Sequence, residues 1–414
     1  MALETPMIPK VQSSGDKSLE NTLQLKQLEL NSLLEVTQAI NSNLSEESLY
    51  KIFYFTLIAN LKIKRFALYV LDEEWNCKVS FGIKQDLKNK TLPKKILQIS
   101  TICSMDSSIK GFEEFDLAIP VAHKTNVLAY VLLGGNADQN EKTDIPFIQT
   151  FANIIIVAIE NKKLARKELA QQALKKELEI ARDVQSLLFP KSLPYTDNLK
   201  LKADYLPHHT IGGDYYDYIE LDKNKFIICI ADVSGKGIPA ALLMSNFQAS
   251  LRTLTRQTDD LKKIVNELNY IIKLNAKGDR FITFFIALID TSKNKINFIN
   301  AGHNPSFIIS SEGRVEIMDK GTTVLGVFEN LPFMEEGEIA YTKDSLLFLY
   351  TDGITETSNA KDDEFGQERL LKVLLKKKNE DLSKMHSDLL KDLNKFKGDK
   401  IFPDDITIFS CRIS

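Results

Sequence analysis

Hydrophobic residues are spaced differently in successive stretches of the chain. Over residues 19–40 they recur mostly every three or four positions, which is the spacing of one face of a helix. A mixed region follows, with a predicted helix at 46–61 and strand-like runs at 65–71, 116–121 and 126–133. The pattern therefore predicts a helix, an antiparallel sheet and then a closing helix.

The closing helix is predicted to begin near Thr143 and to continue well beyond this sheet. Residues 154–189 contain neither Gly nor Pro, and Pro190 supplies a stop. The positions that follow the 4-3-4-3 spacing of a coiled coil are Leu174, Leu178, Ala181, Gln185 and Leu188, with Leu164 in phase. Lys167 and Gln171 fall on the same seam, so the pattern is short and imperfect. A dimeric coiled coil and a single helix packed on its own domain both remain open.

Beyond Pro190, runs rich in Ile and Phe alternate with turns that contain Gly and Asp, which is typical of a mostly antiparallel sheet. Residues 281–290 and 295–300, joined by a short polar turn, predict a β-hairpin. Residues 238–257 predict a helix, with Pro239 in its first turn, where a missing N–H group costs little. A domain boundary is therefore expected near residue 190.

These patterns divide the chain into a disordered tail at 1–17, a first domain at 18–160, a helical linker at 161–190 and a second domain at 191–414. A chain of 414 residues is longer than one hydrophobic core normally supports. Its hydrophobic fraction of 43% and charged fraction of 26% are those of an ordinary globular protein. The predicted fold class is α+β.

Charge and hydropathy exclude several classes of protein. A formal net charge of -3 gives no electrostatic reason to expect nucleic acid as the main partner. The longest apolar stretch, residues 154–159, is too short to cross a bilayer. The N-terminal residues are polar and lack the apolar core of a signal peptide. A cytoplasmic protein with no membrane partner is expected.

Cysteine chemistry is not indicated either. The four cysteines are far apart, without a CxxC pair or histidines at zinc spacing: Cys77, Cys103, Cys229 and Cys411. None is followed six positions later by Arg, so the phosphate loop of cysteine-dependent phosphatases is absent. Each is interpreted as a small apolar residue.

Aspartates of the second half stand where predicted strands meet turns. Asp232 and Asp352 each end a strand-like run, Asp404 precedes one, and Asp214 follows two glycines. Any one alone could be an ordinary turn residue, but acids at strand ends can converge on one rim of a sheet. Two carboxylates about 4 Å apart repel by roughly 4 kcal/mol at an effective dielectric of ~20, so a cluster takes up protons or cations. Oxygen ligands suit Mg²⁺ or Mn²⁺, and two such ions can activate water for attack on phosphorus.

The surroundings of these acids form a series of motifs in a specific order. They are IGGDYYDY at 211–218, ADVSGKGIPAALLM at 231–244, NAGHNP at 300–305, LYTDGITE at 349–356 and PDDIT at 403–407. The series closely resembles the bacterial SpoIIE/RsbU group of metal-dependent PP2C-type (PPM) protein serine/threonine phosphatases. The helix ELEIARDVQSLLFP at 177–190 resembles the segment that opens the catalytic domain of that group. The resemblance covers residues 175–414.

This resemblance implies an α-β-β-α sandwich of two antiparallel sheets with two Mn²⁺ or Mg²⁺ ions. It implies that Asp214 and Asp232 bridge the ions, that the backbone carbonyl of Val233 adds a ligand, and that Asp352 and Asp404 complete the set. These four aspartates are the predicted catalytic residues. No arginine in the motifs obviously binds phosphate, as one does in the eukaryotic branch.

Several neighbouring residues have two possible roles. Asp217 could orient a metal-bound water or stabilise a turn, and the structural role is favoured. His303 could act as a general acid, because an ordinary imidazole titrates near neutrality, although a histidine in such a turn more often stabilises the loop. Glu356 has the same ambiguity.

Asp404 and Asp405 are separated by strand alternation. Asp404 shares a face with Ile406, and Asp405 shares one with Thr407. If the metal ions lie at the mouth of the space between the sheets, the ligand should continue the inward face. With the family pattern, this predicts Asp404 as the ligand and Asp405 as a supporting residue.

The first domain resembles a GAF sensor module in its layout, without a specific motif. The whole chain is thus predicted to be a sensor-regulated metal-dependent protein phosphatase, and a homodimer if the linker forms a coiled coil. The resemblance implies phosphoserine or phosphothreonine substrates, namely anti-anti-sigma (STAS) proteins of a partner-switching pathway. The alternatives are a sensor-linked nucleotide cyclase, another two-metal phosphohydrolase and an inactive scaffold. Manganese-dependent phosphate release would separate them.

Overall fold

The computed structural model describes residues 14–87, 90–106, 108–135, 144–276 and 279–414. The chain divides into two compact units, Met1–Gln171 and Gln172–Ser414. Residues 1–13 of the predicted disordered tail lie outside the described residues, but residues 14–17 belong to helix α1 (Ser14–Asn41) instead. In the described part of the chain, no helix is long and apolar enough to span a membrane.

The first unit contains the predicted antiparallel sheet between helices. Its strands pair in the order β2-β1-β5-β4-β3. Their bounds are β1 (Arg65–Leu71), β2 (Trp75–Phe81), β3 (Cys103–Ser104), β4 (Leu117–His123) and β5 (Asn126–Gly134). The helical segments that follow α1 are α2 (Glu46–Phe55), the π-helix η1 (Thr56–Asn60), α3 (Lys94–Leu97) and α4 (Ile145–Ser186).

The two faces of this sheet bury separate hydrophobic clusters. Phe66 of β1 packs with Val36 of α1, Phe53 of α2 and Phe151 of α4. On the other face, Tyr69 packs with residues of the segment that precedes β4. The central strand β1 is therefore apolar on both sides, because helices cover one face and the segment before β4 covers the other.

The second unit is a sandwich of two sheets, as predicted. One sheet has the order β13-β10-β9-β8-β7, with β14 paired to β10, and the other has the order β12-β11-β15-β16-β6. The strands of the first sheet are β7 (Tyr215–Glu220), β8 (Lys225–Val233), β9 (Ile282–Asp290), β10 (Lys295–Ala301), β13 (Gly321–Thr322) and β14 (Gly337–Ala340). Those of the second are β6 (Leu199–Leu206), β11 (Ser306–Ile309), β12 (Val315–Met318), β15 (Ser345–Tyr350) and β16 (Ile406–Ile413).

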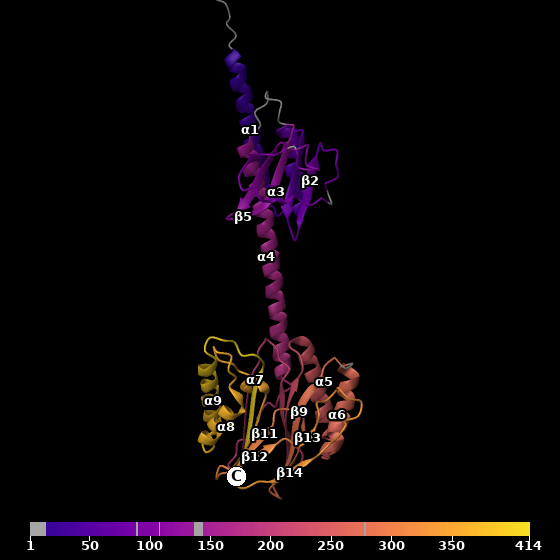
Figure 1. Ribbon diagram of the computed structural model, residues 1–414, viewed down its shortest axis with the longest axis vertical. Coiled ribbons are helices and arrows are strands. Elements are labelled where there is room, and N and C mark those ends of the chain that lie inside the picture. The colour runs from indigo at the N-terminus through magenta and orange to yellow at the C-terminus, as the bar shows by residue number, and fades with distance from the viewer. Residues whose placement is uncertain (1–13, 88–89, 107, 136–143, 277–278) are drawn as a thin grey trace, which may run out of the picture. The chain divides into compact units, whose positions relative to one another are not determined.

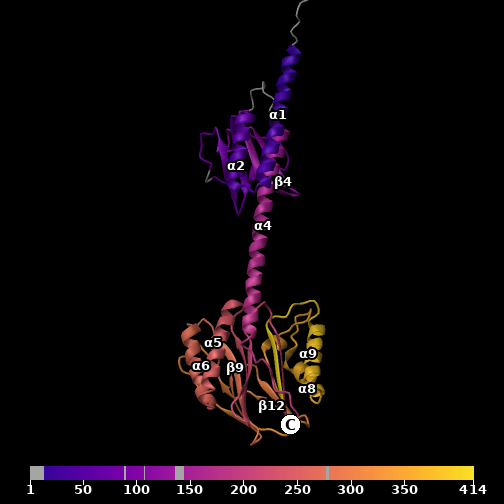
Figure 2. The ribbon, with the colours of Figure 1, turned by 180° about the vertical axis from the view of Figure 1, so that it is seen from behind.

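Helices cover the outer face of each sheet. They are α5 (Ile238–Leu254) and α6 (Leu261–Ala276) on one side, and α8 (Gly366–Lys377) and α9 (Leu382–Lys397) on the other, with the short α7 (Asp352–Thr355) after β15. Figures 1 and 2 show these pairs flanking the sheets within this unit. The predicted hairpin is β9–β10, whose two strands pair antiparallel. In the same sheet, β10 and β13 pair in parallel.

Alternation along β8 explains the layers. Ile228 and Ile230 point between the two sheets, whereas Ile227 and Cys229 point to the cluster beneath α5 and α6. A third cluster fills the space between the second sheet and α8 and α9. The α+β sandwich predicted for the second domain is confirmed.

The predicted coiled-coil seam is partly used inside the second unit. Gln185 is buried, and Leu188 packs against the cluster beneath α5 and α6. These two positions therefore contact their own domain, whereas Leu174 of the same predicted seam is 55% exposed. On a different side, Ile180 and Val184 of α4 and Leu187, in the turn directly after the helix, are 58%, 59% and 67% exposed.

Candidate metal centre

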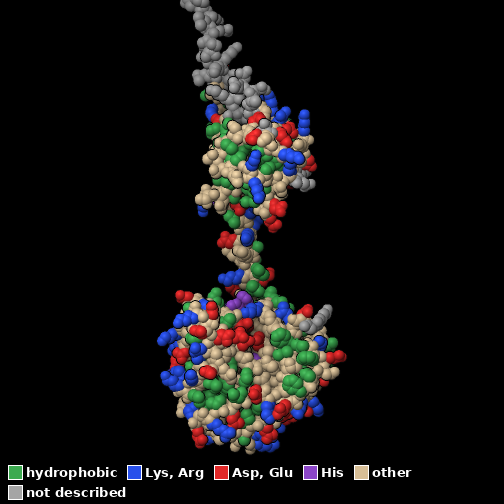
Figure 3. All heavy atoms as spheres, viewed as in Figure 1, with side chains coloured by type: hydrophobic (Ala, Val, Ile, Leu, Met, Phe, Trp, Pro, Cys, Tyr) green, Lys and Arg blue, Asp and Glu red, His purple; other side chains and the backbone are tan. Residues whose placement is uncertain are grey.

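The predicted metal-binding aspartates come from both sheets of the sandwich. Asp214 immediately precedes β7 and Asp232 lies near the end of β8, and the β7–β8 register places them opposite each other. Asp352 begins α7 after β15, and Asp404 lies in the bend before β16. Figure 3 shows acidic side chains gathered around a hollow in the surface of this unit.

Asp214 is held by hydroxyl groups of the opposite sheet. Its Oδ2 accepts a hydrogen bond of 2.9 Å from Thr351 Oγ1 and another from Thr407 Oγ1. The three side chains are almost completely buried. Neither threonine was predicted as a site residue from the sequence, although both lie within the motifs: Thr351 in LYTDGITE and Thr407 in PDDIT. They are the direct link between the acids of the two sheets.

The carboxyl groups lie close enough to perturb one another. Burial raises the pKa of Asp214 well above its usual value, and the charges of Asp232 and Asp405 raise it further. Burial and the charges of Asp352, Asp404 and Asp405 raise the pKa of Asp232 to about 7. Burial and Asp404 also raise the pKa of Asp352. The fold therefore brings all four predicted aspartates into one electrostatic cluster.

Asp405 shapes the loop that carries Asp214. Its carboxylate accepts hydrogen bonds of 2.7 Å from the backbone N–H groups of His208 and Gly213. A Cβ atom on Gly212 would lie 2.1 Å from Asp405 Oδ2, so this approach requires glycine. The Asp405 carboxylate is occupied by backbone donors, as a supporting residue would be.

The strand-face argument for Asp404 is wrong, however. Ile406 packs against the α8 and α9 side of the sheet, whereas Phe409 lies between the sheets, so the inward face belongs to Asp405. Asp404 precedes β16 in a bend, where strand alternation does not apply. Its Oδ2 lies 3.0 Å from Lys236 Nζ.

The donor chemistry of the cluster fits a hard divalent cation. All four side chains offer carboxylate oxygens, the ligands that Mg²⁺ and Mn²⁺ prefer. A Cβ on Gly213 would lie 2.9 Å from the Val233 carbonyl oxygen, so glycine leaves that acceptor clear. Among the described residues, no three His, Cys, Asp or Glu side chains are close enough to hold an ion as they stand. Uncompensated carboxylates repel each other, and a cation would draw them together.

Comparisons with known proteins point to the same chemistry. Residues 222–414 match the family model described as Stage II sporulation protein E (SpoIIE). Phosphoserine phosphatase RsbU of Bacillus subtilis is 33% identical over 188 residues, which are 45% of this chain and 55% of that protein. Protein IcfG of Synechocystis is 30% identical over 240 residues, 51% of this chain and 38% of that protein. This chain thus spans about half or less of the length of these relatives.

The fold of a solved domain agrees. The SiaA-PP2C domain of Pseudomonas aeruginosa has a TM-score of 0.54 with 19% identity, over 59% of this chain and 99% of that domain. The second unit therefore has the fold of a PP2C domain, and its residues 222–414 match the SpoIIE family model. The match leaves out Asp214, which the sandwich nevertheless joins to the matched residues through Thr351 and Thr407.

Asp217 of this PP2C domain lies away from the cluster, in a structural ion pair. Arg252 of α5 contacts it with two hydrogen bonds of 2.8 Å, and Tyr215 Oη donates a third. Asp217 is fully buried, so these partners offset the cost of burying its charge. The structural role favoured from the sequence agrees with these contacts.

His303 also has structural partners at both ring nitrogens. Nε2 lies 3.1 Å from the Tyr350 carbonyl, which can only accept, so Nε2 carries the proton. Nδ1 then accepts from Thr283 Oγ1 at 2.8 Å. Burial lowers the pKa of His303 to about 4. His303 is therefore a neutral imidazole with a hydrogen bond at each ring nitrogen, and it links the two sheets. Its single N–H proton is held by the Tyr350 carbonyl, which leaves none for general-acid catalysis.

Glu356 remains at the edge of the acidic cluster. Burial raises the pKa of Glu356, as do the charges of Asp352, Glu364 and Asp404. Its backbone N–H closes α7 by donating to the Asp352 carbonyl at 2.8 Å. The side chain therefore contributes negative charge near Asp352.

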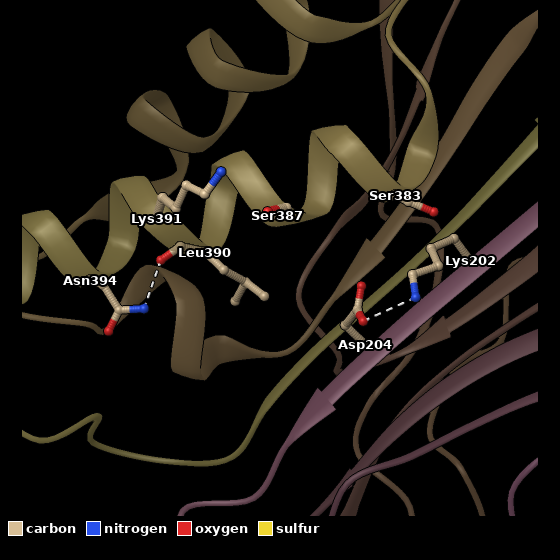
Figure 4. Close-up of a pocket in the computed structure, with 7 residues that line it drawn as sticks. All are labelled: Lys202, Asp204, Ser383, Ser387, Leu390, Lys391 and Asn394. Carbon is tan, nitrogen blue, oxygen red and sulfur yellow. Dashed lines mark hydrogen bonds and ion pairs between the residues drawn. The ribbon is translucent and has the colours of Figure 1, made fainter.

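A cavity of about 370 Å³ lies elsewhere in the domain, between α9 and β6 (Figure 4). Its lining consists of Lys202, Asp204, Ser383, Ser387, Leu390, Lys391 and Asn394. Lys202 Nζ lies 3.2 Å from Asp204 Oδ1, and both side chains enter the view from β6. None of the four predicted aspartates lines this cavity, so it is separate from the candidate metal centre.

Proposed function

We propose that the PP2C domain is a metal-dependent protein serine/threonine phosphatase. The observation that carries the proposal is the meeting of four acids drawn from both sheets: burial and neighbouring charges, that of Asp404 among them, raise the carboxyl pKa values of Asp214, Asp232 and Asp352. An inactive scaffold would have no need to maintain this repulsion.

The proposed ligands are those implied by the family pattern. Asp214, Asp232, Asp352, Asp404 and the carbonyl oxygen of Val233 would hold two Mn²⁺ or Mg²⁺ ions, with Asp214 and Asp232 as the ligands that the family pattern would share between them. Two such ions supply Lewis acidity and an activated water. The chain's part is to hold the acids in place: the threonines fix Asp214 from the opposite sheet, and Asp405 fixes its loop.

The proposed substrate is a phosphoserine or phosphothreonine protein. RsbU and RsbP of Bacillus subtilis are named phosphoserine phosphatases, and they are 33% and 27% identical to 45% and 44% of this chain. The family resemblance extends the proposal to a STAS-domain substrate in a partner-switching pathway, in the cytoplasm. Among the residues that the structure describes, no helix is long and apolar enough to cross a membrane.

Regulation is proposed to reach the centre through α4. The first unit has the helix and antiparallel-sheet layout of a GAF-like sensor, and α4 leaves it and continues to Ser186. Gln185 Nε2 donates a hydrogen bond of 2.8 Å to the Gly212 carbonyl, only two residues from Asp214. A rotation or shift of α4 would therefore move the loop that presents a metal ligand.

Dimerisation through α4 is part of this proposal. The open side of the helix at Ile180, Val184 and Leu187 replaces Gln185 and Leu188 as the seam, because those two face the domain. The full chain should be a dimer by light scattering at micromolar concentration, and Val184→Asp should make it monomeric. The control Glu179→Asp should stay dimeric. A monomeric full chain would refute the seam.

The activity is tested by phosphate release from a phosphoserine protein and from an aryl phosphate. Release is expected with Mn²⁺ or Mg²⁺ and should stop after chelation. Activity that survives thorough chelation would overturn the two-metal proposal. Conversion of ATP to a cyclic nucleotide, without release from the phosphoprotein, would instead support the cyclase alternative.

A further inference from the structure

The loop before α5 presents one lysine to the acidic cluster. Lys236 stands between Gly235 and Gly237, whose φ angles of 91° and 72° are in the left-handed region that favours glycine. Arg280 Nη1 donates to the Ser234 carbonyl at 2.9 Å, and a Cβ on Gly235 would lie 2.1 Å from that nitrogen. The backbone on either side of Lys236 is therefore held in place.

The lysine side chain reaches across to the loop before β16. Its Nζ donates to the Pro403 carbonyl at 2.6 Å and lies 3.0 Å from Asp404 Oδ2. Its positive charge also offsets part of the rise in the pKa values of Asp352 and Glu356. The ammonium group thus sits where a cation is attracted by several acids.

Two described arginines of the same sheet layer, Arg252 and Arg280, have partners outside the acidic cluster. Arg252 is bound by the buried carboxylate of Asp217, and Arg280 by the Ser234 carbonyl. Lys236, in contrast, is 43% exposed and its partner Asp404 is 36% exposed. An ion pair this exposed contributes at most about 1 kcal/mol, so it can be exchanged readily.

Lysine chemistry suits such an exchange. The ammonium is a compact charge with three donors on a flexible stem, and lysine binds phosphate oxygens as a point charge. A divalent ion at Asp404 would attract that carboxylate more strongly than a single ammonium does. The released lysine would remain on its glycine-flanked loop at the edge of the cluster.

We propose that Lys236 is the phosphate-positioning residue of this centre: it pairs with Asp404 when no divalent ion is bound, and binds a phosphate oxygen of the substrate when Asp404 is taken by an ion. The inference rests on the proposed phosphatase function and adds to it the cationic group that the motifs did not reveal. It makes opposite predictions for two ligands, because loss of the ammonium should favour the metal and disfavour phosphate.

The first test is calorimetric titration of the metal-free full chain with Mn²⁺. Lys236→Met should bind Mn²⁺ up to about fivefold more tightly than the unchanged protein, because a competing cation has been removed. Lys262→Met, an exposed lysine of α6, is the matched control and should bind as the unchanged protein does. Equal or weaker Mn²⁺ binding by Lys236→Met would overturn the competition.

The second test uses inorganic phosphate as the probe at saturating Mn²⁺. Lys236→Met should bind phosphate about tenfold more weakly, the effect of losing one charge-assisted hydrogen bond, and Lys236→Arg should retain most of the affinity. With an aryl phosphate, KM should rise in parallel while kcat changes little. Unchanged phosphate affinity, or a fall in kcat alone, would overturn the positioning role.

These results also separate this inference from the proposed function. If the unchanged protein shows no Mn²⁺-dependent hydrolysis, the phosphatase proposal fails, yet both titrations still decide whether Lys236 competes with metal and binds phosphate. If the unchanged protein is active and Lys236→Met binds phosphate equally well, only the role of Lys236 fails.

Discussion

The PP2C domain contains two polar clusters that differ in whether their charged groups are compensated by partners. In the candidate metal centre, the carboxyl groups of Asp214 and Asp232 are buried beside other acids, and burial together with the neighbouring negative charges raises the pKa of both. In the second cluster, His386 Nδ1 lies 2.7 Å from Asp204 Oδ2 and its Nε2 lies 2.7 Å from Ser410 Oγ. Here every ring nitrogen has a partner.

The second cluster has the order of residues seen in a hydrolase triad, yet it cannot work as one. Ser410 is fully buried in β16, which pairs with β15 on one side and β6 on the other. No substrate reaches its hydroxyl group. The cluster instead ties α9 to β6 and β16. The difference teaches that unbalanced charge at a rim, rather than a familiar set of residue types, marks the functional site.

The largest expected effect comes from removing a bridging acid. Asp232→Asn should reduce Mn²⁺-dependent hydrolysis to background, because the proposed ligands act as one unit. The metal-free variant should nevertheless be as stable as the unchanged protein or more stable by ~1 kcal/mol, since repulsion is relieved. Phosphate release and urea unfolding with a chelator measure the two effects. A large loss of stability would show that the cluster is structural.

The adjacent acids provide a second, graded contrast. Asp404→Asn should remove nearly all metal-dependent activity, whereas Asp405→Asn should cost ~10- to 100-fold, as loss of a supporting contact does. The reason is that the Asp405 carboxylate is already occupied by the backbone N–H groups of His208 and Gly213, through which it orients the loop. Steady-state kinetics at saturating Mn²⁺ measures both. The reverse ranking would assign the ligand to Asp405.

The histidine cluster should respond in the opposite way to the metal centre. His386→Ala should lower the free energy of unfolding by ~3 kcal/mol, because it leaves the buried hydroxyl of Ser410 without a partner and the Asp204 carboxylate with Lys202 alone. Activity per folded molecule should change little. Ser387→Ala, at an exposed position of the same helix, should change stability by less than ~0.5 kcal/mol. Loss of activity without loss of stability would mean that this cluster is catalytic.

The smallest effect concerns pH, and the two clusters have opposite signs. The pKa of Asp232 is raised to about 7 in the folded protein, so the folded state binds more protons than the unfolded state between pH ~4 and 7. This term makes the metal-free protein more stable as the pH falls. Burial lowers the pKa of His386 despite its bond to Asp204, so protonation below pH ~6.5 favours unfolding.

Urea unfolding at pH 7 and pH 5, with a chelator, measures these terms. Through this term, the unchanged protein should gain up to ~2 kcal/mol of stability when the pH is lowered from 7 to 5. Asp232→Asn should lack that gain. His386→Gln should show the opposite change relative to the unchanged protein. Identical pH profiles for the three proteins would contradict both assignments.

The amino-acid sequence by itself determined the local features. Ile- and Phe-rich runs interrupted by Gly and Asp predicted the strands of the sandwich, and glycine-flanked acids at their ends predicted the cluster. Such features depend on neighbours in the chain, through periodicity and turn preference. The order of the motifs indicated the family resemblance, because Asp214, Asp232, Asp352 and Asp404 each stand in their own motif of the series.

Tertiary structure alone decided which partner each side chain finds. Asp217 meets Arg252, 35 positions away, and Asp214 meets Thr407, 193 positions away. It also decided that Ile406 faces the helices, which reversed the strand-face argument, and that Gln185 belongs to the domain instead of the seam. A strand covered on both faces is apolar on both, so its sequence does not mark the inward side. Only the packing of the second layer does.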